Sequence, residues 1–97
     1  MQIRNFVWTR KIIEKVIQKH NVDPEDVEEV FDGSHLVYRV EKSKYKALGK
    51  SYAGRYLAVF FIDLGEGNAK PITARDMNSS ERKLFRKKRG QKNETKN

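Results

Sequence analysis

The sequence of 97 residues lacks cysteine, contains only two prolines, and has no long apolar run. Without cysteine, neither a disulfide framework nor a thiolate zinc site can stabilise the fold, and the composition fits a reducing compartment. No segment approaches the roughly 20 consecutive apolar residues that a membrane-spanning helix requires. The first residues, Met-Gln-Ile-Arg-Asn, also lack the apolar segment of a signal peptide. The sequence therefore predicts a cytoplasmic protein without a membrane partner.

Histidine is also scarce, with only His20 and His35 present. They lie in different expected elements, and no His-Glu-x-x-His spacing or paired-carboxylate spacing accompanies them. The Gly65-x-Gly67 segment lies between two expected strands, where it favours a turn, and no helix follows it to bind a nucleotide. The sequence therefore predicts no metal and no cofactor.

Charge is distributed unevenly along the chain, whose formal net charge is +8. Residues 82–97 hold eight Lys or Arg and one Glu, whereas residues 1–81 hold 13 basic and 12 acidic side chains. A basic block of this kind suits a polyanion, although it is also typical of a solvated tail that keeps a small domain soluble. If the polyanion is RNA, the predicted RNA-binding residues are Arg82, Arg86, Lys87, Lys88 and Arg89.

The length of the chain allows one small domain, in which roughly 60–65% of the unfolded surface can be buried. Residues 3–8 resemble a short strand, and apolar side chains on one face predict a helix from residue 9 to His20. Asp23-Pro24 is a typical helix start, and Asp32-Gly33 a typical end. This second helix is rich in acidic residues, so we do not expect it to contact nucleic acid.

Four strands are expected in the second half of the domain. Residues 34–42 alternate in polarity, 45–50 form the next strand, and the apolar run 56–62 is typical of a central strand covered on both faces. The turn at 65–68 leads into a last strand that contains Pro71. Because proline cannot donate a ladder hydrogen bond, we expect an edge or a bulge there.

The segment 72–85 begins as a strand and turns into a helix. Asn78 is a favoured N-cap, and Glu81 can complete a capping box. We expect this helix to end near Lys88, so that 1–88 form one domain and 89–97 a disordered basic tail. The predicted fold is α+β: a mostly antiparallel sheet of four to five strands, two N-terminal helices and one C-terminal helix.

Two arginines are the main candidates for chemistry. Arg75 lies late in a strand near a helix N-terminus, where an anion can bind a guanidinium and free helix amides. Arg55 lies at the start of the central strand, and we expect Arg55 and Arg75 to converge on one face of the sheet and bind phosphate. The alternative for Arg75 is a salt bridge to Glu81 or Asp63.

Metal-free RNA cleavage needs a group that removes the 2′-hydroxyl proton, cations that stabilise the phosphorane, and an acid for the leaving 5′-oxygen. His20 can serve in such a site, or act as a cation at the last carbonyls of its helix. Glu81 has the alternative role of a cap. Lys19 is a further candidate cation, or a solvated side chain.

A family resemblance rests on residues in a fixed order: Trp8; Lys19-His20-Asn21-Val22; Glu28-Glu29-Val30-Phe31; Gly49; Gly54-Arg55-x-Leu57; Ile72-Thr73-Ala74-Arg75-Asp76-Met77; Glu81; and Phe85. This order resembles the BrnT family of type II toxins, small ribonucleases similar in fold to RelE. The resemblance covers about residues 6–86. The family usually has glycine where this chain has Asn21, asparagine where it has Val16, and tyrosine where it has Phe85.

The resemblance implies RNA cleavage during translational shutdown and a BrnA-like antitoxin as partner, in a possible homodimer or toxin–antitoxin heterotetramer. The family residues linked to toxicity correspond here to Arg55 and Arg75, and also to Lys19, His20 and Glu81. The predicted function is therefore that of a metal-independent endoribonuclease toxin. The alternatives are a non-catalytic nucleic-acid-binding module of the same fold, and a protein whose charged helices serve only its antitoxin.

Overall fold

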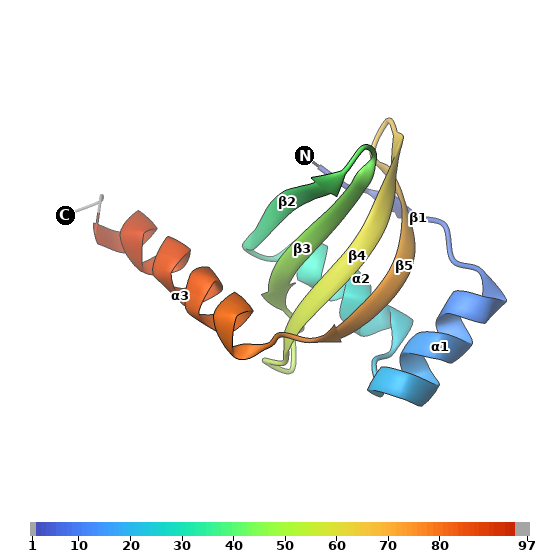
Figure 1. Cartoon of the computed structure of the whole chain (residues 1–97), viewed down its shortest axis with the longest axis horizontal. Helices are drawn as coiled ribbons and strands as arrows, with labels where there is room; N and C mark the ends of the chain where they lie inside the picture. Colours follow the sequence, from blue (N-terminus) through green and yellow to red (C-terminus); the bar gives the residue numbers. More distant parts are fainter. Residues whose placement is uncertain (1, 95–97) are drawn as a thin grey trace.

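The computed structural model describes the backbone of residues 2–94 and the side chains of residues 2–88. Five strands and three helices form it (Figure 1). In chain order they are β1 (Asn5–Phe6), α1 (Arg10–His20), α2 (Pro24–Asp32), β2 (His35–Glu41), β3 (Lys44–Lys50), β4 (Tyr56–Gly65), β5 (Asn68–Asp76) and α3 (Ser79–Glu94).

The strands form one sheet in the order β1-β5-β4-β3-β2. Strands β2 to β5 pair in antiparallel fashion, and only the short β1 lies parallel to its neighbour β5. The predicted α+β fold with a mostly antiparallel sheet is confirmed, and so are the two N-terminal helices and the C-terminal helix. None of the helices in the described residues is long and apolar enough to cross a membrane.

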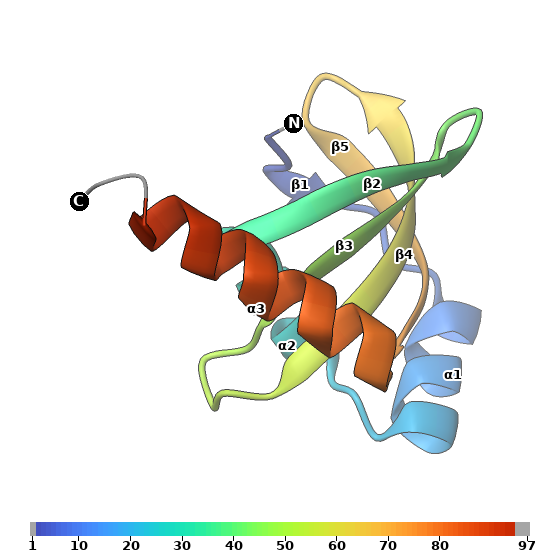
Figure 2. The ribbon, with the colours of Figure 1, turned by 60° about the vertical axis from the view of Figure 1, so that its left-hand side comes forward.

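The helices cover opposite faces of the sheet, with α1 and α2 on one face and α3 on the other (Figure 2). The α1–α2 face holds the larger core, in which Leu57, Val59 and Phe61 of β4 are fully buried. Phe31 of α2 joins this core through tilted and edge contacts with Phe6 and Phe61, each at 5.3 Å between ring centroids. Burying these side chains supplies most of the driving force for folding.

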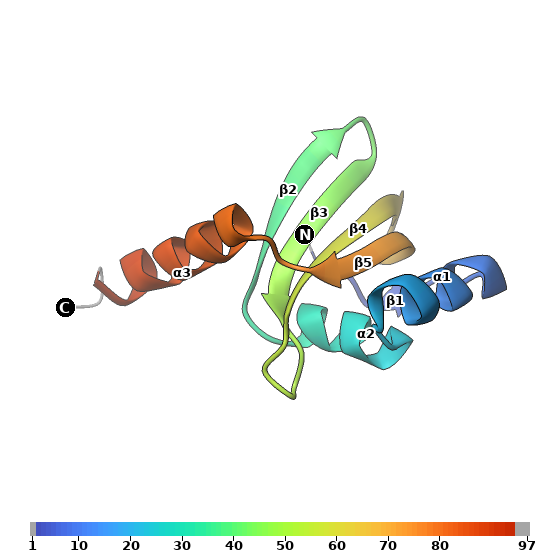
Figure 3. The ribbon, with the colours of Figure 1, turned by 60° about the horizontal axis from the view of Figure 1, so that its bottom comes forward.

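The α3 face has a smaller core, built from Leu48, Ala58, Met77 and Phe85. Phe85 of α3 is 1% exposed, so the first half of the helix is fixed to the sheet. The second half projects away from the sheet (Figure 3).

Tyr38 in β2 packs against this smaller core, and its hydroxyl group has an unusual environment. Its phenol oxygen is buried and has no hydrogen-bond partner among the described residues, and burial raises the pKa of Tyr38. An unsatisfied buried polar group costs about 1–3 kcal/mol. We therefore expect Tyr38→Phe to raise the free energy of unfolding by about 1 kcal/mol, measured by thermal denaturation. Tyr45→Phe is the control, and a lower midpoint for Tyr38→Phe would show that the hydroxyl has a partner.

The predicted irregularity at Pro71 is confirmed. Phe60 pairs with Thr73 and Phe61 pairs with Pro71, so one extra residue of β5 lies between the two pairs. On the other side of β5, β1 pairs only with Asn68 and Ala69. The proline therefore lies directly beside a bulge near the edge of the sheet, where a missing N–H group is tolerated.

The predicted end of the last helix near Lys88 is wrong, because α3 continues to Glu94. Most residues beyond Lys88 are good helix formers, and Gly90 alone costs about 1 kcal/mol relative to alanine. Residues 89–94 of the predicted disordered tail are thus helical, and residues 95–97 lie outside the described part of the chain. The domain boundary at residue 88 stays a prediction.

Candidate active site

The predicted capping box at the start of α3 is present. The Asn78 N–H group donates to Oε1 of Glu81 at 2.9 Å, and the Glu81 N–H group donates to Oδ1 of Asn78 at 2.8 Å. Both bonds satisfy amides that a helix N-terminus leaves without partners. Glu81 is 5% exposed, so the cap fixes a carboxylate inside the corner between β5 and α3.

Arg75 and Lys46 bind the same carboxylate from the sheet. Arg75 Nη1 and Nη2 donate to the two Glu81 oxygens at 2.7 and 3.0 Å, and Lys46 Nζ donates at 3.0 Å. The Arg75 guanidinium and the Lys46 ammonium also lie 5.4 and 5.9 Å from the centre of the Phe60 ring. The ion pair that was the alternative interpretation of Arg75 is therefore present.

This cluster keeps Glu81 ionised. Burial disfavours the charged carboxylate, but the hydrogen bonds from Arg75, from the Asn78 amide and from Lys46 outweigh burial and lower the pKa of Glu81 to about 2. A carboxylate with this pKa is a poor proton carrier at neutral pH. The arrangement favours a role for Glu81 in positioning Arg75.

Arg75 keeps part of its guanidinium available. Nη1 donates both of its hydrogens, one to the Asp76 carbonyl at 3.0 Å and one to the Glu81 carboxylate. Nη2 donates one of its two hydrogens to the same carboxylate. Within the described residues, the Nε–H group and the other Nη2–H group have no acceptor. These two donors lie on one edge of the planar group, the geometry that binds phosphate oxygens in pairs.

Arg55 has a different environment. Its Nε and Nη2 atoms donate to the Asp76 carboxylate at 2.7 and 3.2 Å. Nη2 also donates to the His20 carbonyl at 2.8 Å, and Nη1 donates to the Asn21 carbonyl. The hydrogen bond with Asp76 raises the pKa of Arg55 and lowers that of Asp76. Arg55 thus connects the end of the sheet to the end of α1.

The expectation that Arg55 and Arg75 converge on one face of the sheet is wrong. Arg75 lies over Phe60 on the α3 face, whereas Arg55 binds Asp76 and the end of α1. Consecutive residues of a strand point to opposite faces, so the side chains of Arg75 and Asp76 lie on opposite faces of the sheet. Arg55, which binds Asp76, therefore lies on the face away from Arg75. Both arginines lie at the same end of the sheet, where β4 begins and β5 ends.

The remaining predicted site residues lie at the end of α1. Lys19 and His20 lie in its last turn, with Lys19 exposed and His20 half-buried. Asn21 adopts a left-handed conformation (φ 52°), and its N–H group donates to the Ile17 carbonyl at 3.0 Å. Glycine and asparagine are the residues that tolerate this conformation best. The asparagine in place of the usual family glycine therefore preserves the cap of α1.

Sequence reasoning missed four side chains on the α3 face: Lys46, Lys50, Tyr56 and Phe60. Lys50 lies opposite Tyr56, and Lys46 lies opposite Phe60, in the pairing of β3 with β4. Alternation within 45–50 and 56–62 could have placed all four on one face. It could not show that α3 brings further cations to that face.

The predicted RNA-binding residues of α3 divide into two groups. The Arg82 and Arg86 guanidinium groups lie 4.8 and 5.6 Å from the centre of the Tyr56 ring. Lys87 and Lys88 are exposed on the helix. Arg89 belongs to α3, but its side chain lies outside the described part of the chain.

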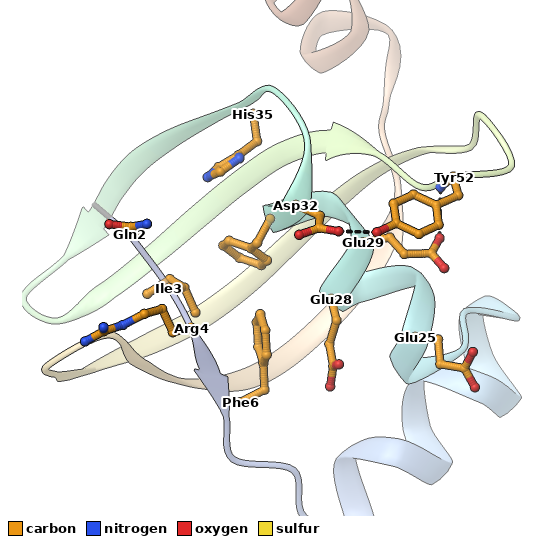
Figure 4. A pocket seen from close by; sticks show the side chains of 11 residues that line it. Gln2, Ile3, Arg4, Phe6, Glu25, Glu28, Glu29, Asp32, His35 and Tyr52 are labelled. Atoms are coloured by element: carbon orange, nitrogen blue, oxygen red, sulfur yellow. Dashed lines mark hydrogen bonds between the residues drawn. The ribbon is translucent and has the colours of Figure 1, made fainter.

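A hollow among the described residues lies elsewhere, between the N-terminal segment and α2 (Figure 4). This groove of about 780 Å³ is lined by Glu25, Glu28, Glu29 and Asp32. Three of these carboxylates already accept hydrogen bonds, Glu28 from Trp8 at 2.8 Å, and Glu29 and Asp32 from Tyr52. Its acidic lining repels a polyanion. In the residues that the structure describes, no three His, Asp or Glu side chains are grouped as a metal site.

The fold is that of a ribonuclease toxin whose structure is known. The chain is similar to the 1.1 Å crystal structure of the Brucella abortus ribonuclease toxin, BrnT, with a TM-score of 0.64 and 23% sequence identity. The similarity covers 81% of this chain and 99% of the Brucella chain. A comparison with curated protein sequences gives no match.

Residues 8–81 match the family model described as "Ribonuclease toxin, BrnT, of type II toxin-antitoxin system". The match covers more than half of the sequence and includes Arg55, Arg75 and Glu81. The chain therefore belongs to the BrnT family of ribonuclease toxins. Most of α3 lies beyond the matched residues.

Proposed function

We propose that the protein is a metal-independent endoribonuclease that cleaves RNA in the cytoplasm and thereby inhibits translation. The observation that carries this proposal is the fixed Arg75 guanidinium, which Glu81 orients through two hydrogen bonds while one donor edge stays available. A donor held in place before the reaction stabilises developing charge without reorganisation. Lys46, bound to the same carboxylate, adds positive charge beside Arg75. Protein cations can thus supply the charge stabilisation that other nucleases obtain from metal ions.

The other family positions receive distinct roles in this proposal. Glu81 positions Arg75, and Arg55 holds the end of α1 against the sheet through Asp76 and two carbonyls. His20 and Lys19 contribute further charge or proton transfer at that end. RNA passes along the basic face of α3, where Arg82, Arg86, Lys87, Lys88 and Arg89 bind its phosphates.

An antitoxin protein is the partner that membership of a type II toxin family implies. We propose that it is a BrnA-like protein whose dimeric DNA-binding half represses the shared operon. Two toxins and two antitoxins would then form a heterotetramer, with a toxin homodimer as the alternative. We also propose that the similarity of the fold extends to RelE.

Substitution of Arg75 tests the proposed activity. We expect the wild-type protein to cleave single-stranded RNA in the presence of EDTA, and Arg75→Ala to cleave it about 100-fold more slowly, because a charge-stabilising donor contributes about 10²–10³-fold. Expression without the antitoxin should arrest growth, and Arg75→Ala should relieve the arrest. Labelled RNA resolved by electrophoresis gives the rates, and growth curves give the toxicity.

Lys83→Ala is the matched control, because Lys83 is an exposed cation of α3 that forms no hydrogen bond or salt bridge with the described residues. It should keep the wild-type rate. Full toxicity of Arg75→Ala would remove Arg75 from the mechanism. A wild-type protein that binds RNA but leaves it intact would instead favour the non-catalytic nucleic-acid-binding module.

A further inference from the structure

Tyr56, the first residue of β4, lies among three cations from two different elements. The Lys50 ammonium of β3 and the Arg82 and Arg86 guanidinium groups of α3 lie 5.6, 4.8 and 5.6 Å from the centre of its ring. Arg82 and Arg86 are one helical turn apart, so both reach the same ring. No described carboxylate forms a salt bridge with any of the three cations, in contrast to Arg75 and Lys46.

The ring of Tyr56 is held firmly although it is only half-buried. Its carbonyl accepts a hydrogen bond from the Met77 N–H group at 3.0 Å, and Tyr56 pairs with Lys50 in the sheet. Phe85 packs edge-on against the ring, with 5.8 Å between centroids and 71° between planes. The fully buried Phe85 therefore supports the ring. A phenol held in a cluster of cations is suited to meet an anion at a fixed position.

The other tyrosines lack this environment. The Tyr38 phenol oxygen is buried, and the Tyr45 ring stacks on Phe61 in the core of the opposite face. The Tyr52 hydroxyl donates to Asp32 of the acidic α2 helix, and this hydrogen bond raises the pKa of Tyr52. For Tyr56 the Arg86 guanidinium and the other nearby positive charges have the opposite effect and lower its pKa.

We propose that Tyr56 is the general acid of RNA cleavage and that Lys50, Arg82 and Arg86 hold the phosphate whose 5′-oxygen leaves. This inference rests on the proposed ribonuclease function and adds a proton donor to it. The site takes a phosphodiester of single-stranded RNA. Phe85 has no proton to give and supports the ring of the acid instead.

The reaction is a transesterification. The 2′-oxygen attacks the phosphorus and loses its proton to solvent, the bond between phosphorus and the 5′-oxygen breaks, and the phenol proton of Tyr56 moves to that oxygen. The products are a 2′,3′-cyclic phosphate and a free 5′-hydroxyl. The three cations stabilise both the phosphorane and the phenolate, which then recovers a proton from water.

A substrate with a sulfur leaving group tests the role of the acid. We expect Tyr56→Phe to cleave ordinary RNA about 10²–10⁴-fold more slowly, the range for general acid catalysis, while its Kd for uncleavable 2′-deoxy RNA changes less than about 3-fold. In RNA with a 5′-bridging sulfur, the leaving thiolate needs no proton because its pKa is far lower than that of an alkoxide. Tyr56→Phe should therefore cleave the sulfur substrate at nearly the wild-type rate.

Tyr52→Phe is the matched control, since it removes a phenol hydroxyl that binds Asp32 of α2, away from the cations around Tyr56, and should cleave both substrates at the wild-type rate. An ordinary-substrate rate unchanged by Tyr56→Phe would overturn the proposal, as would a defect that persists with the sulfur substrate. In both cases the wild-type protein still cleaves RNA, so the proposed ribonuclease function is not contradicted. A wild-type protein that cleaves neither substrate would overturn both.

Discussion

Replacing Glu81 with alanine is expected to lower the free energy of unfolding at pH 7 by about 3 kcal/mol. The pKa of this carboxyl falls from 4.5 to about 2 in the folded protein, and each unit corresponds to about 1.4 kcal/mol. Alanine removes the acceptor for Arg75, Lys46 and the Asn78 amide together. Since 1 kcal/mol shifts the melting temperature of a domain of this size by about 4–8 °C, Glu81→Ala should melt at least about 10 °C lower.

The same contribution should depend on pH. Folding lowers the pKa of Glu81. As the pH falls, this carboxyl therefore takes up a proton at a higher pH in the unfolded chain than in the folded chain. The stabilisation is therefore complete above pH 4.5 and is lost as the pH falls toward about 2. The difference in unfolding free energy between the wild type and Glu81→Ala should shrink over this interval, as measured by urea denaturation at several pH values.

Two variants make this experiment specific. Glu81→Gln keeps a side chain that can accept the Asn78 hydrogen bond but loses the charge, so it should be intermediate in stability. Glu14→Ala removes an exposed carboxylate of α1 that no described cation contacts, and it should match the wild type. A difference between Glu81→Ala and the wild type that stays constant from pH 7 to pH 2.5 would contradict the role of the ionised carboxylate.

Local patterns predicted the parts of the fold that depend on neighbours in sequence. The cap of α3 needs only Asn78 and Glu81 at the right spacing, and the bulge needs only a proline inside a strand. Helical periodicity and helix-end signals predicted the boundaries of α1 and α2 to within about one residue. The end of α3 could not be found this way, because a run of lysine and arginine is compatible with both a helix and a disordered tail.

The candidate site was harder to predict, because its side chains come from separate elements. Alternation assigns a face to Arg75, which lies within a strand, but not to Arg55, which precedes one. The direction of Arg55 is set by Asp76 and by the carbonyls of Asn21 and His20 at the end of α1. These two residues lie 34 and 35 positions before Arg55 in the sequence. Tyr56 was missed for the same reason, since its cations come from β3 and α3.

The contacts of Arg55 lead to the second large effect. Arg55→Ala removes two hydrogen bonds to Asp76 and two to the carbonyls that end α1. Hydrogen bonds that involve charged groups contribute about 1.5–3 kcal/mol each when buried, and the 65% exposure of the Asp76 side chain reduces this. We expect a loss of about 2–3 kcal/mol in unfolding free energy, measured by urea denaturation.

The loss should be concentrated at the end of α1. The Asn21 and Val22 amides, which donate to the Ile17 and Val16 carbonyls, should exchange with solvent at least about 10-fold faster in Arg55→Ala. Arg55→Lys should recover only a small part of the protection, because an ammonium cannot reproduce the planar donor arrangement. Arg10→Ala, at the exposed start of the same helix, is the control and should leave both amides unchanged. An Arg55→Ala variant that keeps wild-type exchange but loses toxicity would show that Arg55 acts on RNA and not through α1.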